Sequence, residues 1–313
     1  MIIFRVLLYF TSFFVIWYCS GIIIKSVENI AQRFRVTPFA MSFFVLGILT
    51  SIPEFSVGIN SIINNTPDIF IGNLLGASLI IFIFIIPILA VFGSGVRLVH
   101  QLNENNLIFS LLVVASPVFL IADNVLTRTE GVFLIIIYFI LFYFIEKRHG
   151  LMEIQKEKKQ FLNKNFFEDI IGLLIAGAVL FLTSRYLVTE TVYFSSVLKI
   201  SQFIISLIVL SIGTNLPEIS LAISAVISGK NEVALGDYLG SAAANTFLFG
   251  LFTLLNGKRV NVGIYSFRIL FLTLLGLGIF YFFSRSKNNI SKNEGKILLL
   301  IYLLFILSQI LFP

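Results

Sequence analysis

The chain has 313 residues, of which 58% are hydrophobic and only 12% are charged, and its mean hydropathy is +1.00. This composition excludes an ordinary soluble domain, because too few ionisable side chains remain to cover a water-exposed surface. The net charge of +6 does not indicate a nucleic-acid partner, because Lys and Arg cluster in a few short loops, as they do in membrane proteins. We therefore expect an all-α membrane protein embedded in the lipid bilayer.

Ten hydrophobic segments follow one another along the chain, and we expect each to form a transmembrane helix. The first imitates a signal peptide, but its apolar run is too long and it lacks a small-residue cleavage site. The basic stretch "EKRHGLMEIQKEKKQFLNKN" separates the fifth segment from the sixth. This division predicts a first five-helix repeat over residues 1–146, a polar loop over 147–166 and a second five-helix repeat over 167–313. The segments lie near residues 3–24, 38–63, 68–93, 107–122, 131–146, 167–185, 198–228, 233–254, 264–284 and 296–312.

The distribution of basic residues predicts the orientation in the cell membrane. If the N-terminus is outside, most Lys and Arg residues fall in the loops on the inside, including those of the long central loop. Both termini are therefore expected outside, and the central loop is expected in the cytoplasm. Because each half has an odd number of helices, the second half enters the membrane in the opposite sense from the first.

The two halves also share a sequence pattern. A shift of 164 residues, which takes Glu54 to Glu218, pairs "LGILTSIPEFSVGI" (46–59) with "LSIGTNLPEISLAI" (210–223). Apolar matches are common in such a composition, but Thr, Pro and Glu recurring together are not. The opposite orientation of the halves then predicts an inverted repeat, with its motifs over 47–81 and 211–245.

A proline and a glutamate in mid-membrane each need a physical reason. A carboxylate near the bilayer centre costs about 2.5–3.5 kcal/mol on insertion scales. Pro53 cannot donate to the carbonyl of Leu49, and Pro217 likewise frees the carbonyl of Gly213. A free carbonyl in hydrocarbon is penalised unless it lines a cavity or binds a ligand. A single proline is usually only a kink, but its recurrence beside glutamate favours a binding site.

The oxygens near each break fit a hard cation. Thr50 and Glu54 are four residues apart and share a helix face, as do Thr214 and Glu218. Each broken helix thus offers a carboxylate, a hydroxyl and free carbonyls, and Ca²⁺ takes about 6–8 such oxygens. Two facing carboxylates repel each other unless a divalent cation, several monovalent cations or protons neutralise them. The pattern therefore predicts a cation site between the halves.

The helix after each broken helix contains a glycine motif, "GNLLG" (72–76) or "GDYLG" (236–240), whose Gly-x-x-x-Gly face allows close approach of backbones. Asp237 and its repeat mate Asn73 are expected about two turns into these helices. Asp237 is either an acid favoured by the helix dipole or a part of the ion path.

The residues that follow the glycines differ between the halves. Ser241 and Asn245 lie on one helix face of the second half and can add two oxygens. The matching positions of the first half are Ala77 and Ile81, which add none.

These motifs resemble the α-repeats of the cation/Ca²⁺ exchanger superfamily, of the Na⁺/Ca²⁺ exchanger type. The family pattern is Gly-Thr-Ser-x-Pro-Glu followed by Gly-Asn/Asp-x-x-Gly-Ser-Asn, and "LTSIPE", "GTNLPE", "GNLLGAS" and "GDYLGSAAAN" carry the resemblance. It covers nearly the whole chain, as in the compact prokaryotic sodium:calcium antiporters. It implies an antiporter, not an enzyme, that exchanges cytoplasmic Ca²⁺ for external Na⁺, or for H⁺, by alternating access. Helices one and six would slide across a rigid core, and no cofactor besides the transported ions is implied.

The resemblance also implies roles for individual residues. It assigns the central carboxylates to Glu54 and Glu218, the backbone-and-hydroxyl ligands to Thr50 and Thr214, and the Na⁺-site hydroxyls to Ser51 and Ser241.

Three positions depart from the family pattern. Asn215, which is retained as a candidate cation ligand, stands where the second repeat normally has Ser. Ala77 replaces a ligand Ser, and Ile81 replaces the polar residue that faces Asn245. The usual coupling of three Na⁺ to one Ca²⁺ is therefore open, and fewer Na⁺ or H⁺ are alternatives. A non-transporting cation-binding membrane protein is the competing interpretation, and the sequence leaves the oligomeric state and the direction of transport open.

Overall fold

The computed structural model describes residues 2–33, 50–93, 95–99, 104–149, 166–227, 232–262, 266–285 and 289–311. Within these ranges, eight helices are long and apolar enough to cross a membrane, or nine if one bent pair is a single span. The predicted all-α membrane class is confirmed. The segment expected at 38–63 is described only from residue 50 onward, so the count of ten stays a prediction.

The helices are α1 (Ile2–Arg33), α4 (Ile52–Ile63), α5 (Pro67–Ile80), the π-helical η2 (Ile81–Ile85), α6 (Ile86–Phe92), α7 (Glu104–Leu120), the 3₁₀ turn η3 (Ile121–Asp123), α8 (Arg128–His149), α9 (Phe166–Leu198), α10 (Gln202–Ile205), the π-helical η4 (Ser206–Leu210), α11 (Ser211–Thr214), α12 (Leu216–Ile227), α13 (Leu235–Asn256), α14 (Ser266–Arg285) and α15 (Lys292–Leu311). The described residues also form five short strands: β1 (Val96–Val99), β2 (Val125–Leu126), β3 (Glu232–Ala234), β4 (Val260–Asn261) and β5 (Asn289–Ile290).

Two helices are longer than the sequence predicted. Helix α1 continues past residue 24 to Arg33, and α9 runs unbroken to Leu198, whereas its segment was expected to end near residue 185. Neither extension contains a proline or a glycine, so nothing in the local sequence ends the helix there.

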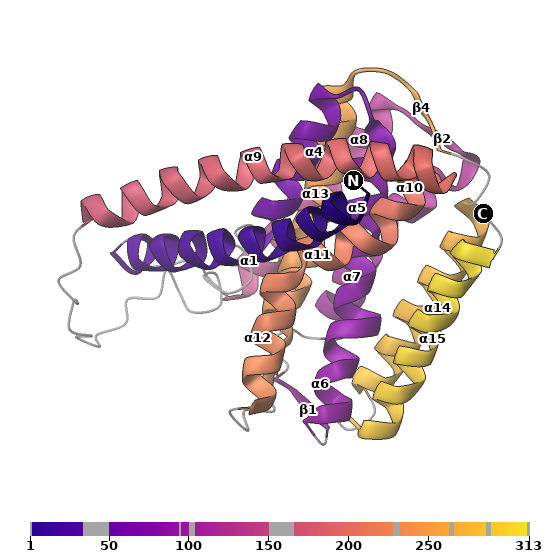
Figure 1. Cartoon of the computed structure of the whole chain (residues 1–313). Coiled ribbons are helices and arrows are strands. Elements are labelled where there is room, and N and C mark those ends of the chain that lie inside the picture. The colour runs from indigo at the N-terminus through magenta and orange to yellow at the C-terminus, as the bar shows by residue number, and fades with distance from the viewer. Residues whose placement is uncertain are drawn as a thin grey trace.

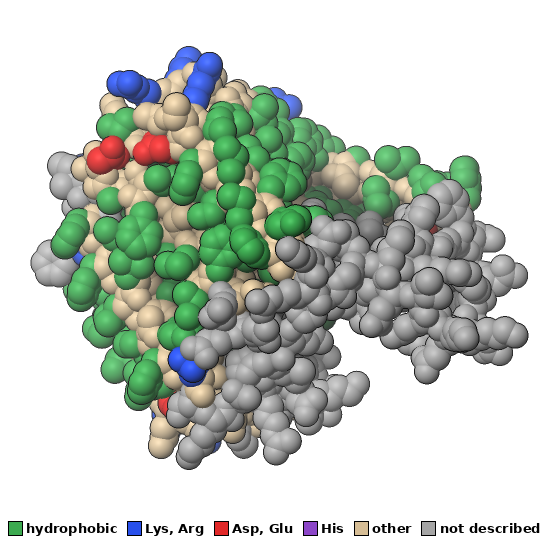
Figure 2. Space-filling model, turned by 180° about the vertical axis from the view of Figure 1, so that it is seen from behind, with side chains coloured by type: hydrophobic (Ala, Val, Ile, Leu, Met, Phe, Trp, Pro, Cys, Tyr) green, Lys and Arg blue, Asp and Glu red, His purple; other side chains and the backbone are tan. Residues whose placement is uncertain are grey.

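The helices form a central layer with covering helices around it. The continuous stretch from α5 through η2 to α6 is largely buried, and so is α13, which packs against α5 and α8. Helices α1 and α9 lie side by side and run across the other helices, while α14 and α15 cover α6 and α7 (Figure 1). Apolar side chains cover much of the opposite face of the molecule (Figure 2), as a lipid-facing surface requires.

The strands pair connecting segments that lie at the same end of the molecule. Strands β3, β1 and β5 form one sheet in that order, and β2 pairs with β4. The two groups lie at opposite ends of the molecule (Figure 1). This grouping matches the predicted topology, in which the segments of β1, β3 and β5 share one side of the membrane and those of β2 and β4 share the other.

The antiparallel strand pairs support the predicted repeat. Val96 pairs with Ile290 in one, and Val260 pairs with Leu126 in the other. The shift of 164 residues carries Val96 to Val260 and Leu126 to Ile290, so one pair maps onto the other in the same register.

A second correspondence follows each of these strands. Thr127 and Glu130 form a capping box at the start of α8, in which the Thr127 amide donates to Glu130 Oε2 at 2.6 Å. Ser291 and Glu294 do the same at the start of α15, at 2.7 Å. Both residues of each box are 164 positions apart from their counterparts, which supports a repeat that extends to the last helix of each half.

Candidate cation-binding site

Each glutamate of the predicted site lies in the first turn of a helix. Helix α4 begins at Ile52, with Pro53 and Glu54 in its first turn, and α12 begins at Leu216, with Glu218 in its first turn. The chain bends by 47° at Asn215, between residues 202–214 and α12. Because the first N–H groups of a helix have no intrahelical partner, a proline costs little there and the helix dipole favours a carboxylate.

The structure describes one of the two predicted carbonyl ligands, Leu49 and Gly213. Leu49 lies outside the described residues. Gly213 is buried, and its carbonyl is not free as predicted, because it accepts the backbone N–H of Asn215. A Cβ placed on Gly213 would overlap the ring of Phe13 in α1. Glycine is therefore required at this position because α1 packs directly against the break, which brings the covering pair of helices to the site.

Both carboxylates are buried and only partly satisfied. Glu54 is 1% exposed and Glu218 is 3% exposed. Glu54 Oε1 accepts a hydrogen bond from Asn215 Nδ2 at 3.3 Å, and Glu218 Oε1 accepts one from Ser241 Oγ at 3.1 Å. The Oε2 atom of each is buried without a hydrogen-bond partner. A buried carboxylate in this state is strongly destabilised unless a positive charge lies close to it.

No protein cation supplies that charge in the part of the chain that the structure describes. The ion pair found there joins Arg5 to Glu190 and involves neither Glu54 nor Glu218. The described residues also contain no cluster of three or more His, Cys, Asp or Glu side chains. Any cation held here would be bound by two carboxylates and neutral oxygens, a ligand set that suits hard cations such as Ca²⁺.

The threonine of each half contacts the glutamate of the other half. The Thr214 hydroxyl interacts with the Glu54 carboxylate, and the Thr50 hydroxyl interacts with Glu218. Each predicted Thr–Glu pair shares a helix face, but the structure brings each hydroxyl to the carboxylate of the other half. The two halves therefore form a single site.

Asn73 is a member of the cluster that the sequence named only as the repeat mate of Asp237. Its Oδ1 accepts a hydrogen bond from Thr214 Oγ1 at 3.3 Å, and its Nδ2 is buried without a partner. The available signal was an amide inside a Gly-x-x-x-Gly face. The predicted close approach is confirmed for that face, because a Cβ on Gly72 or Gly76 would overlap backbone carbonyl oxygens of the segment from α10 to η4.

The remaining predicted ligands are Ser51 of the first half and Ser241 and Asn245 of the second. Ser51 Oγ donates to the Ser241 carbonyl at 3.4 Å, which joins α4 to α13. Asn245 is 2% exposed, and neither polar atom of its amide has a hydrogen-bond partner. Asn245 is thus a buried polar side chain whose amide can still coordinate a cation. Its counterpart in the first half, Ile81, is fully buried and apolar.

Asp237 does not lie where the sequence placed it. Helix α13 begins at Leu235, so Asp237 is in its first turn and not two turns in. The reason is β3, which pairs with β1 over Glu232–Ala234 and delays the start of the helix. The Asp237 side chain lies outside the described residues.

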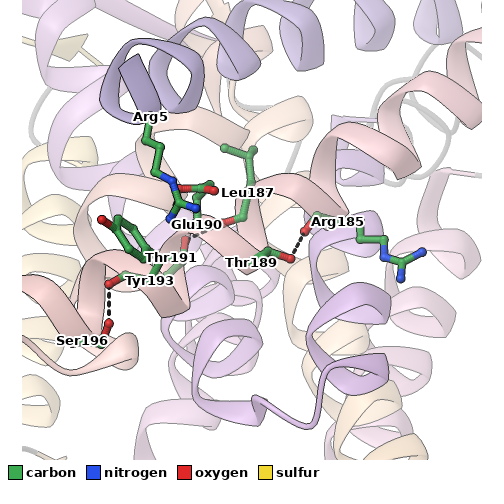
Figure 3. Close-up of polar contacts among 8 residues, drawn as sticks. All are labelled: Arg5, Arg185, Leu187, Thr189, Glu190, Thr191, Tyr193 and Ser196. Atoms are coloured by element: carbon green, nitrogen blue, oxygen red, sulfur yellow. Dashed lines mark hydrogen bonds and ion pairs between the residues drawn. The ribbon is translucent and has the colours of Figure 1, made fainter. Parts of the chain in front are cut away.

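A second polar cluster lies between α1 and α9 (Figure 3). The Arg5 guanidinium lies 3.8 Å from Glu190 Oε2 and 4.0 Å above the ring of Tyr193. The Tyr9 hydroxyl and the Thr191 hydroxyl are hydrogen-bonded at 2.9 Å. These contacts fasten α1 to α9 near one end of the pair.

Known proteins share this architecture. The sequence profile described as sodium/calcium exchanger protein matches residues 4–146 and 169–311. The sodium/calcium exchanger MaX1 of Methanosarcina acetivorans is 24% identical over 331 residues, which cover 92% of this chain and 93% of that protein. Inner membrane protein YrbG of Escherichia coli is 25% identical over 261 residues, which cover 80% of this chain and 79% of that protein.

Two solved structures show the same fold. The sodium-calcium exchanger NCX_Mj, soaked with Na⁺ and Sr²⁺, superimposes with a TM-score of 0.68 at 22% identity over 98% of this chain and 99% of that chain. The H⁺/Ca²⁺ exchanger CAX superimposes with a TM-score of 0.76 at 14% identity over 99% of this chain and 82% of that chain.

The fold and the family profile define a membrane transporter of the exchanger class. Since the family profile covers most of its length, the chain belongs to the sodium/calcium exchanger protein family.

Proposed function

We propose that the protein is a secondary active antiporter that exchanges Ca²⁺ for Na⁺ across the cell membrane by alternating access. The observation that carries this proposal is the pair of buried carboxylates, Glu54 and Glu218, each with one oxygen that has no partner. Thr50, Thr214 and Ser241 add hydroxyl oxygens that touch these carboxylates. A dehydrated Ca²⁺ bound there neutralises both charges, and Na⁺ ions that replace it do the same.

The same site must be reached from both sides of the membrane in turn. Helices α1 and α9 are the elements suited to move, because they cross the others, and Phe13 of α1 lies against Gly213 at the helix break. A shift of this pair along the core exposes one end of the site and covers the other. In this proposal the central loop is cytoplasmic and both termini are outside.

The second candidate is H⁺-coupled exchange of Ca²⁺. Ala77 and Ile81 favour it, since the first half lacks two oxygens that the second half has in Ser241 and Asn245. The name of the similar structure CAX, an H⁺/Ca²⁺ exchanger, shows that this fold accommodates such coupling in that protein. Protons on Glu54 and Glu218 would then take the place of Na⁺.

The test is ⁴⁵Ca²⁺ uptake into proteoliposomes, driven in separate experiments by an outward Na⁺ gradient and by a pH gradient, with protein-free liposomes as the blank. We expect uptake with the Na⁺ gradient. Uptake with the pH gradient alone establishes the second candidate. Absence of uptake and of Ca²⁺ counterflow, from protein that elutes as a folded species, contradicts both and leaves a cation-binding protein that does not transport.

A further inference from the structure

The two carboxylates of the site have different neighbours. Glu218 Oε1 accepts a hydrogen bond from the hydroxyl of Ser241, whereas Glu54 Oε1 accepts one from the amide nitrogen of Asn215. The position related to Ser241 by the repeat is Ala77, which is fully buried and has no hydroxyl. The Glu54 side of the site has thus lost a hydroxyl and gained an amide.

These two donors differ in what they do to a cation. A hydroxyl oxygen donates one hydrogen bond and still has lone pairs that can coordinate a cation, whereas an amide nitrogen only donates. Ser241 can therefore hold Glu218 and bind Na⁺ at the same time. The amide nitrogen beside Glu54 cannot coordinate a metal ion, so the Oδ1 atom of Asn215, which is buried without a hydrogen-bond partner, is the one atom of this side chain left for that role.

The orientation of the Asn215 amide is fixed by two acceptors. Its Nδ2 donates to the Ser211 carbonyl at 2.8 Å and to Glu54 Oε1 at 3.3 Å. Turning the amide over would set its oxygen against a carbonyl oxygen and a carboxylate oxygen, with no hydrogen between them. Asn215 is 1% exposed, so water does not compensate for that repulsion.

We propose that the Asn215 amide takes the place of a monovalent cation beside Glu54, so that Asn215 and Ala77 together limit the exchange to two Na⁺ for each Ca²⁺. This inference rests on the proposed function of the site. The charges agree with it, because two carboxylates are balanced by one Ca²⁺ or by two Na⁺. A third Na⁺ would leave an uncompensated positive charge in a buried site where Ala77 and the Asn215 nitrogen offer it no ligand. Exchange is then electroneutral.

Electroneutrality makes a sharp prediction for transport. With one net charge moved per cycle, a membrane potential of 100 mV shifts the equilibrium by about 2.3 kcal/mol, which is a change of about 50-fold in the Ca²⁺ gradient at steady state. With two Na⁺ per Ca²⁺, the gradient does not change. We expect the wild-type Ca²⁺ gradient, measured in proteoliposomes whose potential is set by K⁺ and valinomycin, to be independent of the potential.

Two variants separate the effect of the Asn215 amide on the coupling from the effect of the hydroxyl that Ala77 lacks. The double variant Ala77→Ser with Asn215→Ser supplies hydroxyls on the Glu54 side in the arrangement that the Glu218 side has, and we expect its Ca²⁺ gradient to approach the 50-fold dependence on a 100 mV potential. Ala77→Ser alone is the matched control, since it retains the amide on Glu54 and should stay independent of the potential. A wild-type gradient that follows the potential overturns the inference, as does a double variant that transports without following it.

A binding measurement tests the inference without transport. Displacement of ⁴⁵Ca²⁺ by Na⁺ from detergent-solubilised protein should show a Hill coefficient that does not exceed about 2 for the wild type, since two monovalent charges replace one divalent charge. A wild-type coefficient clearly above this value contradicts the role of Asn215. Loss of Ca²⁺ uptake with displacement of this kind preserved contradicts the proposed transport and leaves the inference on Asn215 intact.

Discussion

Two regions of the molecule bury carboxylates between helices, and they neutralise them in different ways. Glu190, between α1 and α9, is 6% exposed and has the Arg5 guanidinium 3.8 Å away. Glu54 and Glu218, between α4, α12 and α13, have hydrogen-bond donors but no cationic side chain among the described residues. The chain itself supplies the counter-charge at the first region. At the second, none of the described side chains supplies it, and in the proposed function a transported cation does.

The contact between α1 and α9 also follows the repeat. The shift of 164 residues carries Arg5 to Asp169 and relates Asn29 to Tyr193. Arg5 lies over Tyr193 at one end of the pair, and Asn29 Nδ2 donates to Asp169 Oδ1 at 2.9 Å at the other. Contacts at equivalent positions thus join both ends of the pair, which supports the proposal that the two helices move together.

The largest expected effect comes from removing a charge at the site. Glu54→Gln and Glu218→Gln each leave the other carboxylate without its share of the ligands, and we expect Ca²⁺ uptake to fall by about 100-fold or more in each, as for loss of one partner of a buried charge pair. Glu190→Gln is the matched control, with uptake within about threefold of the wild type because Arg5 remains partly solvated. Equal losses of Ca²⁺ uptake in all three variants would contradict the distinction between Glu190 and the two carboxylates of the site.

The next effect comes from the crossed hydroxyls. Thr50→Ala and Thr214→Ala each remove a hydroxyl that interacts with the carboxylate of the opposite half. Hydrogen bonds to charged groups contribute about 1.5–3 kcal/mol, so we expect the Ca²⁺ affinity to fall by about 10- to 100-fold. Thr183→Ala, which removes an exposed hydroxyl that donates to the Val179 carbonyl, should leave the affinity unchanged. Isothermal titration in detergent measures all three.

A smaller effect separates movement from binding. Gly213→Ala places a methyl group against Phe13, and overpacking of this kind costs about 1–3 kcal/mol. We expect the turnover rate to fall by about 10-fold with little change in Ca²⁺ affinity, because the strain lies between α1 and the core. Phe13→Leu in the same chain should restore much of the rate. A change confined to affinity would mean that Gly213 acts on the ion and not on the moving pair.

The smallest effect is expected when both partners of the protein ion pair are removed together. Arg5→Gln with Glu190→Gln leaves no unpaired charge between α1 and α9, so the Ca²⁺ affinity should stay within about twofold of the wild type. Arg5→Gln alone leaves Glu190 buried without its cation and should lower the melting temperature more than the double substitution does. Thermal unfolding followed by intrinsic fluorescence compares them, and a double variant that loses Ca²⁺ binding would place Glu190 in the ion path.

The sequence alone allowed the prediction of features that depend on the spacing of a few neighbouring residues. The recurrence of Thr, Pro and Glu identified Glu54 and Glu218, and the Gly-x-x-x-Gly face of Gly72 and Gly76 predicted the close approach that the structure shows. The capping boxes at Thr127 and Ser291 were not predicted, although Ser or Thr followed three residues later by Glu is a local signal that could have found them.

Features that depend on how the halves meet were not predictable. The crossing of Thr50 to Glu218 and of Thr214 to Glu54 depends on how the two halves pack together, which no spacing within one helix specifies. The pairing of Arg5 with Glu190 joins residues far apart in the chain for the same reason. The position of Asp237 was wrong because a three-residue strand, paired with another strand far away in sequence, moved the start of its helix.

The central claim is that Glu54 and Glu218 hold one cation between them. Equilibrium dialysis of detergent-solubilised protein against ⁴⁵Ca²⁺ tests it directly, with the wild type compared with the double variant Glu54→Gln with Glu218→Gln. The account predicts one Ca²⁺ per chain for the wild type, displaced by Na⁺ or by H⁺, and none for the double variant. Saturable binding of Ca²⁺ by a folded double variant would contradict it.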